Sequence, residues 1–365
     1  MEKLSTLINH LESIAPPALQ ESYDNAGLIT GNPNMEITGA LICLDSTEAV
    51  IDEAIQLGYN LVIAHHPIVF SGMKKFSGDS YVERVIVKAI RHDIALYAAH
   101  TNLDNVAAGV NQEICNRLGL NNISILAPKE GLLKKLVTYA PVAEAEKVRA
   151  ALFAAGAGAI GNYDSCSFNI PGTGTFRGNE QSNPVKGQKG AVHAENEERI
   201  ELIYEAFREP QILSALRQSH SYEEIAWQSV HVTNPLQTVG SGMVGNLPEP
   251  IDYQAFLTLV KDRFNTGIIR YTEPTGKPIQ KVAVCGGSGS FLLKDAIKAG
   301  ADAFVTADFK YHQFFDADGR IFLADIGHFE SEQFTMDLFY RILNKKFPKF
   351  AVRLTATPTN PVRYF

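Results

Sequence analysis

Short apolar segments alternate with helical segments along the first part of the chain, and this alternation limits the possible folds more than any other feature. The apolar segments span residues 40–44, 61–64 and 94–99. Their length and their aliphatic, partly β-branched content are typical of buried strands. Helical spacing follows each of them, at about 47–57, 80–92 and 106–118. We therefore predict an α/β fold with a substantially parallel sheet.

Residues 128–235 differ in pattern from the sequence on either side. We expect a strand at 132–140, an alanine-rich helix at 143–155, hairpin signals at 156–178, strands at 189–195 and 199–206, a helix at 209–220 and a strand at 225–232. This order predicts a ferredoxin-like α+β sandwich. Strand and helix alternation resumes after residue 240. The expected organisation is one split α/β domain, 1–127 with 236–365, and one inserted domain, 128–235.

The composition excludes several classes of protein. A chain of 365 residues with 45% hydrophobic content can bury a sizeable core in two or three domains. A net charge of −7 argues against a dedicated nucleic-acid binder, which usually carries a basic face. The apolar runs are much shorter than the ~20 residues that cross a bilayer. The four cysteines are scattered, and residues 1–11 have an amphipathic helical pattern rather than that of a signal peptide, so we expect a soluble cytoplasmic protein without membrane association.

Two adjacent histidines, His65 and His66, follow the strand expected at 61–64. Ligands of open α/β sheets bind at the carboxyl ends of the strands. Neighbouring residues of an extended chain point in opposite directions, so each imidazole could bind a different metal ion, or one could bind while the other orients it. Isolated histidines usually have no such role, but this tandem position favours a metal role for at least one of the two.

Two further pairs have the same chemical character. His100 and Asp104 follow the strand expected at 94–99, although Asp104 could instead be the N-cap of the next helix. His328 and Glu332 are four residues apart and would share one face of a helix, although a solvated helix start is the alternative. Imidazole and carboxylate groups at such positions are typical of metal sites.

Two features could attract an anion. The segment Gly286-Gly-Ser-Gly289, expected between a strand and a helix, could present backbone N–H groups to an anion or form a simple tight turn. Lys74 and Lys75 could attract an anionic substrate, or lie in a solvated loop.

Four motifs together resemble the Nif-three-like family, whose members are commonly labelled GTP cyclohydrolase I type 2 homologs. The motifs are Glu21-Ser-Tyr-Asp-Asn-Ala-Gly-Leu-Ile-Thr-Gly31, Ala64-His-His-Pro67, His100-Thr-Asn-Leu-Asp104 and Gly327-His-Phe-Glu-Ser-Glu-Gln333. The resemblance extends over the whole chain, and the insert is similar to that of the long bacterial members, which carry a central domain like PII and CutA proteins.

The resemblance implies a dinuclear metal site and a closed homohexamer. The ligands carried over by motif position are His65, His66, Asp104, His328 and Glu332, and His100 is expected to line the site. All of these donors are nitrogen or oxygen, a set that suits two divalent ions of zinc, iron, manganese, cobalt or nickel without choosing among them.

The resemblance also implies metal-dependent hydrolysis of GTP, a related nucleotide or another anionic small molecule. Asp104 or Glu332 is the expected bridging carboxylate, and His100, Asp45 and Asp24 are candidate proton-transfer or supporting groups. The alternative is a metal-binding regulatory assembly in which the central domain senses a ligand and any catalysis is incidental.

Overall fold

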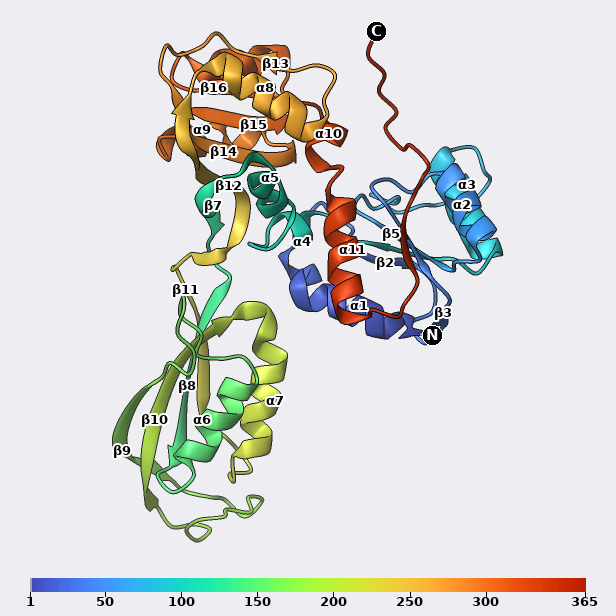
Figure 1. Ribbon diagram of the computed structural model, residues 1–365. Coiled ribbons are helices and arrows are strands. Elements are labelled where there is room, and N and C mark those ends of the chain that lie inside the picture. The colour runs from blue at the N-terminus through green and yellow to red at the C-terminus, as the bar shows by residue number, and fades with distance from the viewer. Residues whose placement is uncertain (1) are drawn as a thin grey trace. The chain divides into compact units, whose positions relative to one another are not determined.

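The computed structural model describes residues 2–365, which form two compact units (Figure 1). One unit comprises Met1–Pro128 and Thr238–Phe365 and is called here the α/β unit; the other, Lys129–Gln237, is called the inserted unit. The predicted fold class, a split α/β domain with a ferredoxin-like insert, is confirmed. Among the described residues, no helix combines the length and apolar character needed to cross a membrane.

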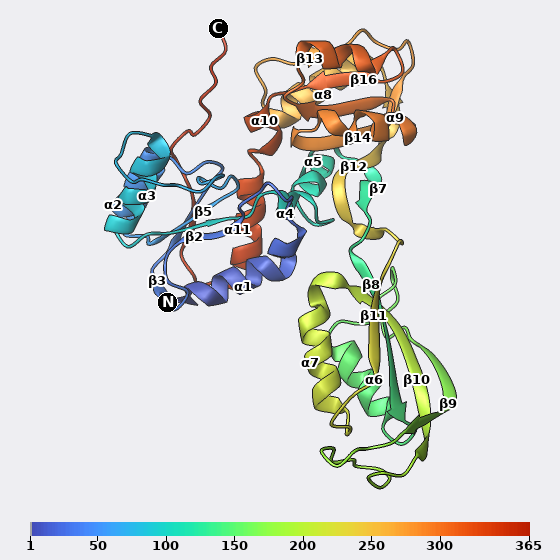
Figure 2. The ribbon, with the colours of Figure 1, turned by 180° about the vertical axis from the view of Figure 1, so that it is seen from behind.

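The first sheet of the α/β unit has helices on both faces (Figures 1 and 2). Its strands, in spatial order, are β17 (Val352–Leu354), β4 (Ala40–Cys43), β5 (Leu61–Ala64), β6 (Ala95–Ala98) and β2 (Gly27–Thr30). All neighbours are parallel except β2. Helices α2 (Glu48–Leu57) and α3 (Tyr81–Arg91) pack on one face, and α1 (Leu4–Ile14) and α11 (Thr335–Lys346) lie on the other. Every residue of β4, β5 and β6 is buried, which explains their uninterrupted apolar sequences.

The second sheet of the α/β unit is also covered on two faces. Its strands, in spatial order, are β13 (Arg270–Tyr271), β16 (Phe322–Asp325), β15 (Ala303–Ala307), β14 (Ile279–Ser288), β12 (Leu236–Ile251) and β7 (Asn121–Lys129). Leu323 packs in the core that includes α9 (Leu293–Lys298). Its neighbour Phe322 instead contacts Phe256 of α8 (Tyr253–Phe264), because successive strand residues point to opposite faces.

The parallel strands of both sheets release polar side chains at their carboxyl ends. These side chains are Asp45 after β4, His65 and His66 after β5, His100 after β6, Asp308 after β15, and His328 and Glu332 on α10 (His328–Glu332) after β16. Asp104 ends the short helix α4 (Thr101–Asp104), which follows β6. This placement is the one expected for a ligand site in an open α/β sheet.

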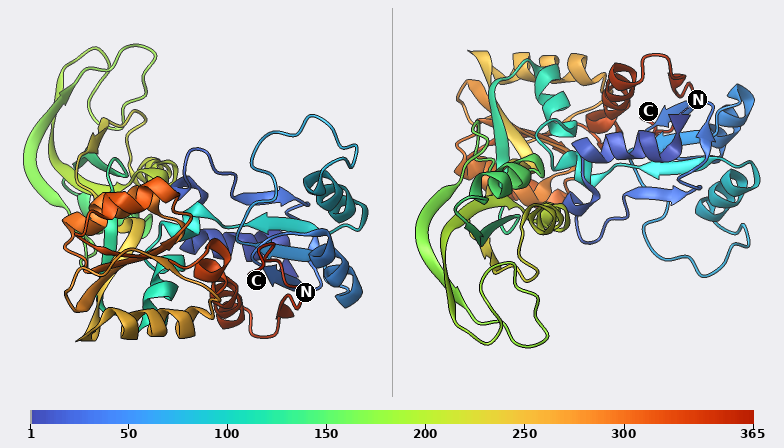
Figure 3. Two further views of the ribbon diagram at one scale, coloured as in Figure 1. Left: turned by 90° about the horizontal axis from the view of Figure 1, so that it is seen from above. Right: turned by 90° about the horizontal axis from the view of Figure 1, so that it is seen from below.

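The inserted unit has the predicted βαββαβ order, although its second strand lies in the 156–178 segment, where only hairpin signals were expected. Its elements are β8 (Leu133–Pro141), α6 (Ala145–Ala154), β9 (Phe168–Phe176), β10 (His193–Glu205), α7 (Glu209–Ser219) and β11 (Trp227–Val232). The sheet order is β11-β8-β10-β9 with antiparallel pairing throughout. Helices α6 and α7 cover one face, and the loop between β9 and β10 makes a long excursion (Figures 1 and 3).

Three local predictions are wrong. The strands expected at 189–195 and 199–206 form the single strand β10, because pairing with β8 and β9 continues through its polar stretch. The helix expected at 106–118 begins at Val110 as α5 (Val110–Leu118), because Val106 pairs with Val239 in an isolated bridge. Asp104 therefore caps no helix at 106. Strands β2, β7, β12, β13 and β17 of the two main sheets were not predicted.

The remaining short elements do not contribute to the main sheets. They are β1 (Glu2–Lys3), β3 (Glu36–Ile37), and the 3₁₀ helices η1 (Pro17–Leu19), η2 (Ala206–Arg208), η3 (Ser290–Leu292) and η4 (Tyr311–Ala317).

Candidate metal centre

Four histidines meet at the strand ends, and an oxygen atom holds the Nδ1 atom of each one. His65 Nδ1 lies 2.9 Å from the carbonyl oxygen of Ala99. The other three Nδ1 atoms face carboxylates: His66 with Asp45 at 2.7 Å, His100 with Asp24 at 2.8 Å, and His328 with Asp308 at 2.6 Å. An acceptor on Nδ1 fixes the proton there and leaves the Nε2 lone pair available to a metal ion.

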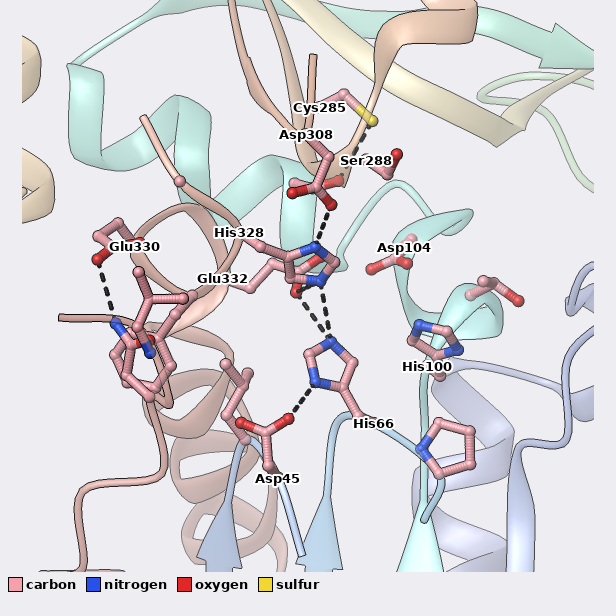
Figure 4. Close-up of a pocket in the computed structure, with 18 of the residues that line it drawn as sticks. Asp45, His66, His100, Asp104, Cys285, Ser288, Asp308, His328, Glu330 and Glu332 are labelled. Carbon is pink, nitrogen blue, oxygen red and sulfur yellow. Dashed lines mark hydrogen bonds and ion pairs between the residues drawn. The ribbon is translucent and has the colours of Figure 1, made fainter. Parts of the chain in front are cut away.

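One group of metal-ligand type, called here the first cluster, comprises His66, His328 and Glu332 (Figure 4). The Oε2 atom of Glu332 lies 3.0 Å from His66 Nε2 and 3.1 Å from His328 Nε2. The two Nε2 atoms are 3.3 Å apart. Because both Nδ1 atoms already have carboxylate partners, two lone pairs and a carboxylate oxygen converge here, which suits a shared cation.

A second cluster comprises His65, Asp104 and the same Glu332. The Nε2 atom of His65 lies 3.6 Å from Asp104 Oδ1 and 3.8 Å from Glu332 Oε1. The His65 Nε2 and Asp104 Oδ1 atoms are buried and have no hydrogen-bond partner. A buried nitrogen and oxygen left unpaired at this separation fit a metal ion between them.

Glu332 belongs to both clusters because its two oxygen atoms point in different directions. Its Oε2 atom belongs to the first cluster and its Oε1 atom to the second. Gly287 of β14 makes room for this carboxylate: a Cβ atom there would lie 2.4 Å from Oε1, and the φ of +58° also favours glycine. The shared position identifies Glu332, rather than Asp104, as the candidate bridge.

The ionisation of the site follows from burial and charge. Burial lowers the pKa of His65. Burial also opposes the charged form of His66, but its hydrogen bonds to Asp45 and Glu332 raise the pKa to about 9. The same balance, with Asp308 and Glu332 as partners, raises the pKa of His328 to about 11. In the metal-free protein, protons therefore occupy the first cluster where a cation would otherwise lie.

The two carboxylates of the centre are shifted in opposite directions. Burial and the charge of Glu332 raise the pKa of Asp104 well above its usual value. Burial would also raise the pKa of Glu332, but its histidine partners hold it well below the usual range. A positive charge between the two carboxylates would favour the charged form of both.

The clusters open into a cavity of about 810 Å³. Tyrosine and phenylalanine side chains line it: Tyr23 and Phe291 are the most exposed of them, and the others are Phe70, Tyr81, Phe329 and Tyr364. Arg270 is the only arginine among the lining residues, which include no lysine, and it pairs with Asp325. The cavity thus combines histidine and carboxylate groups at its floor with the apolar faces of aromatic rings.

The C-terminal segment forms part of the same cavity wall. Thr359 donates to the second oxygen of Asp45, the carboxylate that holds His66. Asn360 donates to Glu330, and Pro361, Val362 and Tyr364 line the cavity. The last residues of the chain therefore contact the groups around the first cluster.

The structure brings all five predicted ligands together. It also shows what His100 and Asp45, the candidates for proton transfer, contact. His100 lies beside them, with its Nδ1 atom on Asp24, and forms a third metal-type group with His65 and His66. Asp45, a candidate for proton transfer or for a supporting role, lies 2.7 Å from His66 Nδ1, which fits the supporting role.

Of the two expected anion-attracting features, the lysines lie outside the cavity wall, whereas the glycine segment lines it through Gly286 and Ser288 but has two of its N–H groups already paired. Lys74 and Lys75 are not among the residues that line the cavity. The N–H groups of Gly286 and Gly287 donate to Asn111 and Ser331, so they are not available to an anion.

Sequence reasoning missed Asp308 completely. The sequence pattern that could have found Asp308 is the pattern that identified Asp45, a carboxylate placed directly after a buried apolar strand. That signal could not show which histidine the carboxylate would meet.

The fold and these side chains define an α/β protein with two clusters that could hold metal ions. The family Duf34/NIF3 (NGG1p interacting factor 3) matches residues 2–361, and the chain belongs to this family. A relative from Halalkalibacterium halodurans, named GTP cyclohydrolase 1 type 2 homolog, is 41% identical over 326 residues, which cover 88% of this chain and 87% of the relative. A Bacillus subtilis relative of the same name is 36% identical over 364 residues, covering 98% and 97%.

A solved structure of a Bacillus cereus protein related to NIF3 has the same fold. It superposes with a TM-score of 0.86 at 36% identity and covers 100% of this chain and 99% of that one. The family resemblance predicted from the four motifs is confirmed.

Proposed function

We propose that this protein binds two divalent metal ions and uses them to hydrolyse a nucleotide or a related anionic small molecule. The observation that carries the proposal is the shared carboxylate of Glu332, with one oxygen in each cluster and a histidine Nε2 atom beside each oxygen. The first ion would be held by His66, His328 and Glu332. The second would be held by His65, Asp104 and Glu332.

Two ions held by one carboxylate supply an activated water molecule and polarise the bond under attack when they are bound. The chain's own groups then have separate tasks. Asp45 and Asp308 hold His66 and His328 in one tautomer, with Nε2 toward the centre. His100 is fixed by Asp24 and has a side chain only partly buried at the cavity, so it is the group placed to give or take a proton.

The substrate class follows from the cavity wall. Tyr23, Phe70, Phe291 and Tyr364 offer ring faces on which a nucleobase or similar heterocycle can stack. Arg270 offers a cationic group to a phosphate. The relatives' name, GTP cyclohydrolase 1 type 2 homolog, places GTP among the first substrates to examine.

The test is metal-dependent turnover against nucleotides, phosphoesters and cyclic amides. We expect activity that a chelator abolishes and that a divalent transition metal restores. His100→Gln should lower kcat without lowering the metal content, whereas His65→Ala should lower both. Turnover that is insensitive to the chelator would overturn the proposal.

We also propose a homohexamer. Tyr311 and Phe315 contact each other with ring centroids 5.5 Å apart, and they are 73% and 66% exposed. Two exposed rings in contact are a candidate for surface that a partner chain covers, and the number of six chains comes from the family resemblance. Light scattering should give a mass of six chains, and a monomer would contradict the proposal.

A second candidate function is a metal-binding regulatory assembly without significant catalysis. One observation favours it: the inserted unit has a cavity of its own, formed only by its own residues. A hexamer that holds its metal ions but turns over no substrate would support this candidate.

A further inference from the structure

A cavity of about 430 Å³ lies within the inserted unit. Its wall comes from the ends of β9 and β10, from the long loop between them, and from the residues before β11. This volume is in the range of sites that hold small molecules. None of the predicted metal ligands belongs to it.

A buried carboxylate forms part of the wall. Glu197 of β10 is only 8% exposed, and it accepts one side-chain hydrogen bond, 2.9 Å long, from the hydroxyl of Tyr222. Among residues 2–365 no lysine, arginine or histidine forms an ion pair with it. A carboxylate can accept about four hydrogen bonds, so most of its capacity faces the cavity unused.

The adjacent strand β9 leaves room for this carboxylate. A Cβ atom on Gly174 would lie 2.0 Å from Glu197 Oε2, although the backbone there requires no glycine. Gly172, two residues earlier on the same strand, has open space around it. Gly174 is therefore the position at which the absence of a side chain matters for Glu197.

The hydrogen-bond donor to Glu197 is itself held in place. The N–H of Tyr222 donates to Nδ1 of the buried His220, and Nε2 of His220 donates to the carbonyl oxygen of Tyr139. The rings of Phe176 and Tyr222 lie 6.1 Å apart at the same cavity. Burial and the charge of Glu197 raise the pKa of Tyr222, so the phenol remains a donor.

We propose that this cavity binds a small molecule with an ammonium or guanidinium head group, which pairs with Glu197 beside the rings of Phe176 and Tyr222. A cation would supply the counter-charge that the buried carboxylate lacks. Aromatic rings next to a carboxylate also attract cations through their π faces. Arg177 and Lys186, exposed at the rim, could pair with a carboxylate carried by the same ligand.

The experiment uses the full chain and calorimetric titration at low ionic strength. The probes are agmatine, arginine and citrulline. Arginine and citrulline differ mainly in the charge of the terminal group, and agmatine lacks the carboxylate of arginine. We expect saturable binding of arginine or agmatine at least about tenfold tighter than that of citrulline. Tighter binding of arginine than of agmatine would assign a role to the rim cations.

Two matched pairs of variants locate the site. Glu197→Gln should weaken cation binding by at least about tenfold, whereas Glu195→Gln, the same change two residues away on the strand, should alter it much less. Gly174→Ala should weaken binding because the new methyl group displaces the carboxylate, and Gly172→Ala should not. Circular dichroism of each variant separates loss of binding from loss of fold.

The binding measurements can either support or overturn the proposed cation site. Selective binding of the cationic probes that depends on Glu197 supports the proposal. Citrulline bound as tightly as arginine, full binding by folded Glu197→Gln, or no saturable binding of either cation would overturn it. Each result is independent of the metal centre, because metal content can be measured on the same samples.

Discussion

Replacement of Glu332 by glutamine is the change with the largest expected effect on metal binding. The Oε2 atom of Glu332 lies 3.0 Å from His66 Nε2, and its Oε1 atom lies 3.8 Å from His65 Nε2, so this one side chain belongs to both clusters. The amide has nearly the same shape but carries no charge, and it has only one oxygen atom. If the two proposed ions are bound, this single substitution would remove the charged carboxylate that they share.

The magnitude can be set from the contacts. Loss of a group that only orients a ligand typically costs about 10–100-fold in metal affinity. Glu332 is expected to contact the ions directly, so the loss should reach at least about 100-fold for each ion, or about 2.7 kcal/mol. At micromolar metal concentration, the variant should hold clearly fewer than two ions per chain.

The measurement is elemental analysis together with competitive titration against a chelator. Glu330→Gln is the matched control, because Glu330 is a buried carboxylate of the same helix that lies in neither cluster. His65→Ala should remove the second ion and retain the first. A folded Glu332→Gln protein with two ions at wild-type affinity would refute the shared-carboxylate interpretation.

Four further predictions concern pH, the supporting carboxylate, the inserted unit and the C-terminal segment. Metal affinity should rise with pH through about 9 and on toward about 11, because the raised pKa values of His66 and His328 keep protons in the metal-free first cluster. The same protons stabilise the metal-free fold fully below the unfolded pKa, and this stabilisation is lost as pH rises through the folded values. Metal titration at several pH values is the test of affinity, and a flat or falling profile would contradict the prediction. Asp308→Asn should weaken the first-cluster ion by about 10–100-fold and leave the second unchanged, which a two-phase titration would resolve. A chain with residues 129–237 replaced by a Gly/Ser linker should still bind two ions, since no ligand lies in that unit, and loss of metal from a folded variant would contradict this. Removal of residues 359–365 should speed metal loss to a chelator, because Thr359 no longer holds Asp45; an unchanged rate would show that this contact is dispensable.

Much of the fold is encoded in local sequence patterns. The apolar segments of β4, β5 and β6 have both faces buried, so each is recognisable without knowledge of its partners. The order of elements in the inserted unit was also predictable, although its strands are partly exposed, β9 showed only hairpin signals, and the polar stretch of β10 was interpreted as a break. That stretch remains extended because β8 and β9 pair with it on either side.

The histidines and carboxylates of the centre were also identifiable as candidates from the sequence. His65 and His66 directly follow an apolar strand, and the four-residue spacing of His328 and Glu332 places them on one side of a helix turn. These are short-range relations. They indicate which side chains are available at strand ends, and they do not indicate which of them meet.

Only the tertiary structure determines which of these side chains contact one another. His66 and His328 are 262 positions apart in the chain, and only the packing of the α/β unit brings their Nε2 atoms within 3.3 Å. The same packing gives Glu332 one oxygen in each cluster and places Asp308 on His328. Sequence determined the set of groups available for a metal centre, because strand and helix positions follow from local patterns. The choice of bridge and of supporting carboxylates depended on distances between remote segments, which no local pattern contains.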